Sequence, residues 1–461
     1  MTDYLDIPIT ELSRAYVDHN ATPVEVIDAY LARINALEPK LGAFQVVYED
    51  DARMAAEAAT KAMRSGHRIG PFHGVPFALK DIIDVEGRVT TGGSAAMKDR
   101  LSQTTATIAQ RLIAAGGILL GKTKTVEVAM GGWGTNPRMG TPWNPWDLNV
   151  PRTPGGSSAG SGVAVAARMA GCAIGTDTGG SVRLPAAWCG IVGLKVTEGY
   201  LPTDGIIPLS HTLDTPGPMT RTIADTVLMF ETMAGRHPSE TDRDLARREG
   251  LFAALDKGVA GLRLGCLPQA EREDVDADIL SLYHDALARL RDLGAEIVSF
   301  NPPMPFEVMK EGAGIIIASE GYYYHGALFD DPTAPVDEDV RQRILMGRDI
   351  KARDYVAALI RRRADQAVFL EHMRGLDGVL TPTIATTPVA LADVDQSSTP
   401  ARFTRAANYL GQCGISIPAG LTPNGLPGGL QIMARAGDEA MAIRVGAAFE
   451  AITSGIGLPV L

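Results

Sequence analysis

The chain has 461 residues, 45% of them hydrophobic and 21% charged, an ordinary globular balance that excludes disorder, coiled coil and fibre. Lys and Arg number 43 against 54 Asp and Glu, and the formal net charge of −11 disfavours binding to a nucleic acid. The four cysteines include no CxxC pair and the eight histidines no HxH or HExxH spacing, so we expect reduced thiols, no metal and no cofactor. The acidic start lacks an apolar segment and the apolar runs are short, which predicts a cytoplasmic protein without a signal peptide or membrane span.

The predicted elements begin with a helical segment over residues 1–65. Thr22, Pro23 and Glu25 have the pattern of an N-cap, a first-turn proline and a capping-box glutamate before a helix that runs to Leu37. From Gly74 onward, short apolar strands alternate with helices, which predicts an α/β fold whose sheet is covered by helices. The expected strands are 75–79, 118–120, 172–175, 262–267, 295–300, 378–380, 416–418 and 429–433. The other expected helices are 50–64, 106–115, 161–169, 279–293, 352–372 and 440–452.

One domain over residues 1–461 is expected, because neither an internal repeat nor a long linker divides the chain. After the helical segment, it comprises a first half over 66–235 and a second half over 236–461 that completes the sheet. Polar composition predicts a surface excursion at 235–261 and a mobile loop at 393–402. The three arginines at 361–363 are interpreted as a solvated helix face rather than as a nucleic-acid site.

Two motifs match known patterns in the wrong context. Residues 116–123 satisfy the P-loop pattern G-x-x-x-x-G-K-[ST], but a helix precedes the glycines and a strand lies inside the motif, the reverse of the order that phosphate binding requires. Residues 156–160 satisfy G-x-S-x-G with Ser158 as the serine. That nucleophile elbow needs a strand leading into it, whereas Pro151 and Pro154 precede it. We therefore favour neither a nucleotide site nor a histidine-dependent hydrolase.

Glycine is concentrated in one part of the chain, where 11 of its 50 copies fall between residues 151 and 200. Residues 154–162 form a Gly/Ser run directly before an apolar helix, which argues against a flexible linker. Gly179, Gly180 and Ser181 follow an expected strand. Such a turn can direct successive N–H groups toward one point beside a serine, as in an oxyanion hole, although a tight structural turn explains these residues equally well.

Taken together, these segments resemble the amidase signature family. Residues 155–161 (GGSSAGS) and 175–186 (GTDTGGSVRLPA) are similar to its serine- and glycine-rich signature. Residues 74–81 (GVPFALKD) look like its lysine-bearing strand, and residues 425–431 (GLPGGLQ) resemble a further family block. The similarity extends from about residue 10 to 452, and it implies the amidase signature fold, a mixed sheet with helices on both faces, with 66–235 as the catalytic half.

The resemblance also implies the catalytic residues: a Ser181 nucleophile, with Ser157 and Lys80 as a proton relay and a cis peptide bond before Ser157. A lysine can act as a base only when neutral, so burial must lower its pKa. Arg183 is expected to support the loop without touching substrate. The oxyanion N–H groups are then expected from Thr178, Gly179 and Gly180. Substrate contacts are expected from Met130, Gly131 and Gly132.

The function that follows is hydrolysis of a small carboxamide to a carboxylate and ammonia or an amine by a stand-alone amidase, with a homodimer as an allowed assembly. The alternative is the amidase (glutaminase) subunit of a glutamine-dependent tRNA amidotransferase, whose corresponding stretch residues 339–347 resemble. Residues 319–325 do not resemble that enzyme. Aromatic residues hint at an aryl pocket, although core packing or a surface loop explains them as well: Tyr322, Tyr323, Tyr324, Trp133 and Trp143.

Overall fold

Eleven strands form one sheet in this computed structural model, which describes residues 4–236, 250–453 and 456–461. The order across the sheet is β1-β3-β2-β4-β6-β5-β10-β11-β9-β7-β8. The strands are β1 (Phe44–Val47), β2 (Pro76–Lys80), β3 (Ile118–Thr123), β4 (Cys172–Asp177), β5 (Val192–Lys195), β6 (Thr215–Thr220), β7 (Arg263–Cys266), β8 (Glu296–Ser299), β9 (Gly378–Pro382), β10 (Cys413–Leu421) and β11 (Pro427–Ala434). β2 lies parallel to β3 and β4, and β7 lies parallel to β8 and β9, whereas the other pairs are antiparallel. The sheet is mixed, as expected.

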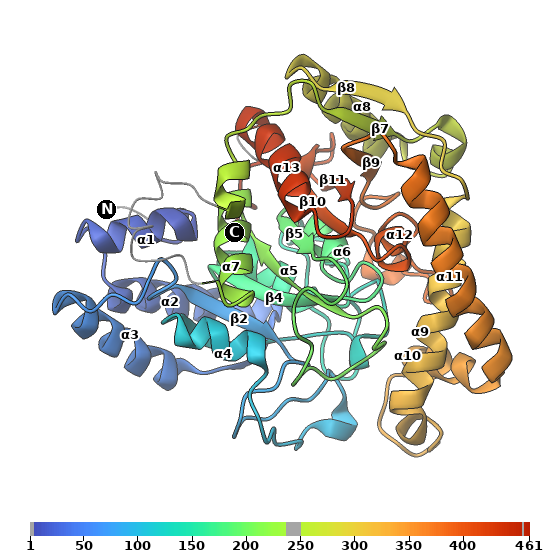
Figure 1. The fold of residues 1–461 in the computed structure, drawn as a ribbon. Helices are drawn as coiled ribbons and strands as arrows, with labels where there is room; N and C mark the ends of the chain where they lie inside the picture. Colours follow the sequence, from blue (N-terminus) through green and yellow to red (C-terminus); the bar gives the residue numbers. More distant parts are fainter. Residues whose placement is uncertain (1–3, 237–249, 454–455) are drawn as a thin grey trace.

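Helices cover both faces of this sheet (Figure 1). They are α1 (Ile9–Val17), α2 (Pro23–Leu41), α3 (Glu49–Arg64), α4 (Thr107–Ala114), α5 (Ala159–Ala166), α6 (Arg183–Cys189), α7 (Ile223–Met233), α8 (Ala277–Asp292), α9 (Phe306–Phe329), α10 (Glu338–Leu345), α11 (Ala352–His372), α12 (Thr404–Tyr409) and α13 (Glu439–Thr453). Alternate side chains of a strand point to opposite faces. Accordingly, Phe77 and Leu79 of β2 join the apolar cluster that includes α4 and α7, and Ala78 joins the cluster of α2, α3 and α5.

The N-terminal segment is mostly helical, and α2 begins as expected. The Thr22 side chain accepts a hydrogen bond from the Glu25 N–H, and the Glu25 carboxylate accepts one from the Thr22 N–H at 2.9 Å. The expectation of helices alone over residues 1–65 is wrong, because β1 pairs antiparallel with β3 at one edge of the sheet. A strand of four residues is too short to show a periodicity of its own.

β6 was also missing from the expected strands. Its sequence contains Pro216, Gly217 and Pro218, a composition typical of turns. Antiparallel pairing with β4 nevertheless places these residues opposite Thr176, Gly175 and Ile174. Tertiary contacts with β4 therefore decide the conformation of this segment.

The two predicted polar excursions differ in what the structure describes. Residues 237–249 of the first lie outside the described part of the chain, and residues 250–254 form a short 3-10 helix. In the second, the segment 393–402 packs against the protein: Ala401 is buried, and the Ser398 carbonyl accepts a hydrogen bond from the Trp133 indole at 3.1 Å.

α5 follows the Gly/Ser run and is buried along its whole length. Its small residues allow the backbone of neighbouring segments to approach closely. A Cβ placed on Gly160 would lie only 2.6 Å from the Lys124 amide nitrogen, so no larger residue fits there. This packing fixes the start of α5, and with it residues 157 and 158, against the end of β3.

A buried ion pair fixes the turn between β4 and α6. The Asp177 carboxylate accepts hydrogen bonds from Arg183 Nε at 3.0 Å and Nη2 at 2.9 Å, and from the Gly180 N–H at 2.7 Å. Asn408 Nδ2 donates to the same carboxylate at 2.9 Å, and Arg183 Nη1 donates to Gln431 Oε1 at 2.6 Å. Burial alone would raise the pKa of Asp177, but the charge and hydrogen bonds of Arg183 hold it at about 2. The pair therefore joins β4, α6, α12 and β11.

Arg183→Met should lower the free energy of unfolding by about 3–5 kcal/mol, because it leaves the Asp177 carboxylate buried without its counter-ion. The double variant Asp177→Asn/Arg183→Met should lose clearly less than the sum of the two single variants, as urea denaturation of all four proteins would measure. Arg53→Met is the matched control, because Arg53 pairs with Asp28 at the surface and should change stability by less than about 1 kcal/mol. Strict additivity of the two buried substitutions would contradict the coupling.

Candidate active site

Lys80 is the last residue of β2 and is fully buried. Its Nζ donates hydrogen bonds to Ser157 Oγ at 2.7 Å and to Thr176 Oγ1 at 2.8 Å. Burial lowers the pKa of Lys80 to about 7, although the negative charges of Asp214 and Asp177 act in the opposite direction. A substantial fraction of this lysine is therefore neutral at physiological pH, which a base requires.

Ser157 is held by its backbone on both sides. The Gly156–Ser157 peptide bond is cis, as the resemblance implies. The Ser157 carbonyl accepts hydrogen bonds from the Val126 N–H at 3.2 Å and from Thr125 Oγ1 at 2.9 Å. A Cβ on Gly156 would lie 2.6 Å from the Gly134 amide nitrogen, so glycine is required at this position.

Ser181 lies beside this pair at the end of the turn that follows β4. The Ser158 N–H donates to the Ser181 carbonyl at 3.3 Å, which brings the two serine-bearing segments into contact. The Ser181 residue is 8% exposed and lines a cavity of about 70 Å³. The structure thus places Lys80 and Ser157 in direct contact and Ser181 at the wall of an adjacent small cavity.

The turn that carries Ser181 is tied down at each of the preceding three residues. Thr178 Oγ1 donates to Asp214, and the Gly179 carbonyl accepts a hydrogen bond from Thr404 Oγ1 at 2.8 Å. The Gly180 N–H departs from the expectation, because it donates to Asp177 Oδ1 at 2.7 Å rather than facing an oxyanion. Gly180 has a φ of 130°, and a Cβ there would collide with Thr404. The carboxylate of Asp177 therefore determines how the turn is oriented.

The small cavity also contains the three residues expected to contact substrate. The lining comprises Ala129, Met130, Gly131, Gly132, Thr178, Gly179, Ser181, Leu184, Leu209, Ile317, Arg343, Ser398, Thr399, Ala401 and Arg405. Its apolar residues provide a surface for a short hydrocarbon segment. The two arginines come from the second half of the chain.

Four functional candidates were missed by reasoning from the sequence. Thr176 was treated as a neutral replacement of serine, but its hydroxyl accepts a hydrogen bond from Lys80. Asp214 accepts hydrogen bonds from Thr178 and from the N–H groups of residues 209 and 210, yet no local pattern marks it. Arg343 and Arg405 lie more than 150 residues after Ser181, and only the fold brings them to it.

The two misleading motifs have structural roles. Within residues 116–123, β3 occupies the place of a phosphate loop, and Lys122 Nζ is buried and donates to the Val89 carbonyl at 3.1 Å. Ser158 is buried as well: its Oγ donates to the Thr176 carbonyl at 3.3 Å and accepts from the Thr176 N–H at 3.2 Å. Neither side chain is placed to meet a substrate.

The aromatic residues lie elsewhere than the Ser181 cavity. Tyr322, Tyr323 and Tyr324 line a separate cavity of about 960 Å³ along α9, Trp133 lines a neighbouring one, and Lys40 lies over the Trp143 ring. In the described part of the chain, none of these five side chains is among the residues that line the Ser181 cavity. The expectation of an aryl pocket built from them is wrong, because α9 turns its tyrosines outward.

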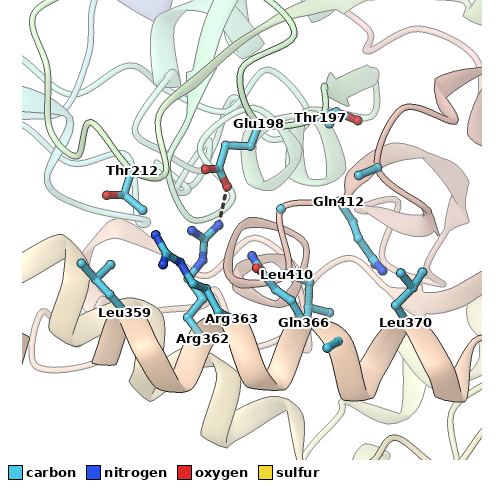
Figure 2. Close-up of a pocket in the computed structure, with 13 residues that line it drawn as sticks. Thr197, Glu198, Thr212, Leu359, Arg362, Arg363, Gln366, Leu370, Leu410 and Gln412 are labelled. Carbon is cyan, nitrogen blue, oxygen red and sulfur yellow. Dashed lines mark hydrogen bonds and ion pairs between the residues drawn. The ribbon is translucent and has the colours of Figure 1, made fainter. Parts of the chain in front are cut away.

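A further cavity of about 620 Å³ lies along α11, where Arg362 and Arg363 extend toward Glu198 (Figure 2). Arg361 is exposed, but Arg362 is buried and donates to the Tyr409 carbonyl at 2.7 Å and to Glu198. The interpretation of all three arginines as a solvated face is therefore wrong for Arg362. The residues that the structure describes around this cavity include none of the predicted catalytic or substrate-contacting residues.

Metal ligands and membrane spans have no counterpart among the described residues. In that part of the chain, no group of three or more His, Cys, Asp or Glu side chains is arranged to hold a metal ion. Among the helices that the structure describes, none combines the length and the apolar composition needed to cross a membrane.

Comparisons with known proteins agree on one family. The family model described as Amidase matches residues 25–443. A subunit of the glutamyl-tRNA(Gln) amidotransferase from Streptomyces coelicolor is 34% identical, with 98% of this chain and 97% of the relative covered. A 2-amino-5-chloromuconic acid deaminase from Comamonas testosteroni is 35% identical, with 94% of this chain and 93% of the relative covered.

Solved structures agree in fold. The peptide amidase from Stenotrophomonas maltophilia superimposes with a TM-score of 0.84 at 29% identity, over 99% of both chains. A protein from a vestigial complex described as revealing the evolutionary origins of an s-triazine catabolic enzyme superimposes with a TM-score of 0.89 at 27% identity, over 98% of this chain and 100% of the other. With the family model spanning nearly its whole length, this chain belongs to the Amidase family, the amidase signature enzymes.

Proposed function

We propose that the protein hydrolyses a small linear carboxamide through an acyl-enzyme on Ser181, with Ser157 and Lys80 as the proton relay. Family membership supports hydrolysis of a carbon–nitrogen bond. The observation that carries the proposed mechanism is the 2.7 Å contact between Lys80 Nζ and Ser157 Oγ, made by a buried lysine with a pKa of about 7. Such a lysine can accept a proton at neutral pH, which an ordinary surface lysine cannot.

The steps follow from this arrangement. Ser181 Oγ attacks the amide carbonyl carbon while its proton passes to Ser157 Oγ, whose own proton passes to neutral Lys80. The N–H groups of Thr178, Gly179 and Ser181 stabilise the tetrahedral oxyanion, while the Gly180 N–H stays on Asp177 and orients the turn. The relay then returns a proton to the leaving nitrogen, the C–N bond breaks, and water hydrolyses the ester on Ser181 by the same route.

We further propose that this chain acts as a stand-alone amidase. Relatives of both kinds are similarly distant: the deaminase is 35% identical and the amidotransferase subunit 34% identical. The tyrosine-bearing stretch 319–325 supports the stand-alone enzyme, because it does not resemble the amidotransferase subunit. The similarity of residues 339–347 to that subunit supports the alternative, a glutaminase subunit of a tRNA amidotransferase.

Substitution of the three proposed catalytic residues should affect turnover to different extents. Ser181→Ala should lower kcat by roughly 10⁴-fold or more, Lys80→Ala by about as much, and Ser157→Ala by roughly 10²–10³-fold. Ammonia release from a panel of aliphatic, aryl and amino-acid amides measures these losses, and circular dichroism checks the fold. Ser158→Ala is the matched control, because Ser158 only bonds the β4 backbone, and it should retain activity within about tenfold. Full activity of Lys80→Ala would exclude the relay.

The pH dependence of kcat/KM should follow the protonation of Lys80. The lysine is a base only after it loses its proton, so activity should rise with pH through a midpoint near its pKa of about 7 and fall about tenfold per unit below it. Asp214→Asn removes a negative charge that raises this pKa, so the midpoint should move to lower pH. A midpoint that stays in place in Asp214→Asn would show that another group controls the profile.

Dependence on a partner distinguishes the two functions. The purified chain should release ammonia from at least one small amide without any other subunit. The comparison assay uses glutamine as substrate, with and without added tRNA and amidotransferase partner subunits. Glutaminase activity that arises only in the presence of those partners, together with inactivity of the isolated chain on the amide panel, would establish the alternative.

A further inference from the structure

We infer that the amide hydrolysed at Ser181 carries a negative charge, held by Arg405 and Arg343. This inference deepens the proposed function and rests on it for the identity of the site. The observations that carry it are two arginine side chains in the wall of a cavity of about 70 Å³ that also contains the nucleophile. A guanidinium is the side chain best suited to bind a carboxylate, because its N–H groups match the two oxygens.

Arg405 lies in α12 with its side chain against the oxyanion turn. A Cβ on Gly179 would lie 3.1 Å from Arg405 Cγ and 3.3 Å from its Nε, and a Cβ on Gly314 would lie 3.3 Å from its Nη1. Glycines on two separate elements therefore leave room for one arginine. Nη1 donates to the Lys310 carbonyl at 3.2 Å, whereas Nε is buried with no hydrogen-bond partner among the described residues. An unpartnered buried N–H beside the reacting group suits an anionic acceptor.

Arg343 approaches the same cavity from α10. Its Nε donates to the Met130 carbonyl at 3.1 Å, and its Nη1 donates to Gln396 Oε1 at 3.0 Å. These bonds fix the guanidinium between the segment that carries residues 130–132 and the segment 396–401 that packs over the cavity. Arg343 is thereby positioned before any substrate arrives, which reduces the entropy lost on binding.

The charge balance around the cavity favours an anion. Among the described residues that line it, there are two arginines and no Asp or Glu. The carboxylate of Glu307 acts on Arg405 but accepts a hydrogen bond from Lys310, and Asp337 and Asp339 act on Arg343 from outside the lining. Burial lowers the pKa of Arg405 to about 10, so it stays charged at neutral pH in a partly desolvated position. A bound carboxylate would offset that desolvation.

The cavity also limits the rest of the substrate. A volume of about 70 Å³ suits a short acyl group, and Leu184, Leu209 and Ile317 offer apolar contacts to its methylene groups. A zwitterionic amino-acid amide would find no carboxylate in the described lining to pair with its ammonium group. The geometry therefore favours a short monoamide of a dicarboxylic acid over glutamine or asparagine.

The test compares amides that differ only in charge. Malonamate and succinamate carry a carboxylate where malonamide and succinamide carry a second amide. The wild-type kcat/KM should be about 10- to 100-fold higher for each anionic amide than for its neutral counterpart, as expected for a charge-assisted hydrogen bond in a partly buried site. Asparagine, which is succinamate with an added ammonium group, should react more slowly than succinamate.

The variants assign this preference to the two arginines. Arg405→Met and Arg343→Met should each lower kcat/KM for succinamate by about 10- to 100-fold and change that for succinamide by less than about threefold. Arg405→Lys should recover part of the loss. Arg363→Met, which removes an equal charge from the separate cavity along α11, is the control and should behave as the wild type. Equal losses for both amides in Arg405→Met would show a merely structural role and overturn the inference.

A binding measurement separates failure of this inference from failure of the proposed function. Calorimetry with Ser181→Ala protein should detect succinamate binding at least about tenfold tighter than succinamide binding, and Arg405→Met in that background should abolish the difference. Equal affinities would overturn the inference even if the wild type hydrolyses both amides. Preferential binding of succinamate by a protein whose wild type hydrolyses no amide would support the anion site and overturn the proposed reaction.

Discussion

The buried amine of Lys80 is the group on which the rest of the site depends. An amine at the end of an apolar strand loses hydration, and the two hydroxyl groups of Ser157 and Thr176 replace part of it. The same loss of hydration brings its pKa to about 7. Solvation, hydrogen bonding and basicity at this point are thus one property of the position, which only the centre of the sheet can provide.

Parallel pairing explains how this position arises. β2 is flanked by β3 and β4, and all three run in the same direction, so the ends that carry Lys80, Thr123 and Asp177 lie along one edge. The serine-bearing segments 157–158 and 178–181 follow at that edge. The Asp177–Arg183 pair then extends the arrangement into α12 and β11, which come from the far end of the sequence. The two halves of the chain therefore build one site.

The sequence predicted the parts of this structure that have a local cause. The apolar strand ending at Lys80, the capping box at Thr22 and the Gly/Ser turns each depend on neighbouring residues and were recognised. β6 was not recognised, because its prolines are accommodated only by pairing with β4. The arginines 343 and 405 were missed for a related reason: an arginine in a helix is ordinary until the fold places it beside a nucleophile. Spatial neighbours far apart in sequence leave no pattern in a single chain.

Helix α12 has a consequence for how substrate range and turnover can change. Within one and a half turns, Thr404 bonds the Gly179 carbonyl, Arg405 packs against the same glycine, and Asn408 bonds Asp177. One short helix therefore touches both the turn that carries the nucleophile and the cavity that receives the acyl group. Selectivity and catalytic rate are mechanically linked here, so divergence of α12 toward a new substrate would be accompanied by compensating change in the β4–α6 turn.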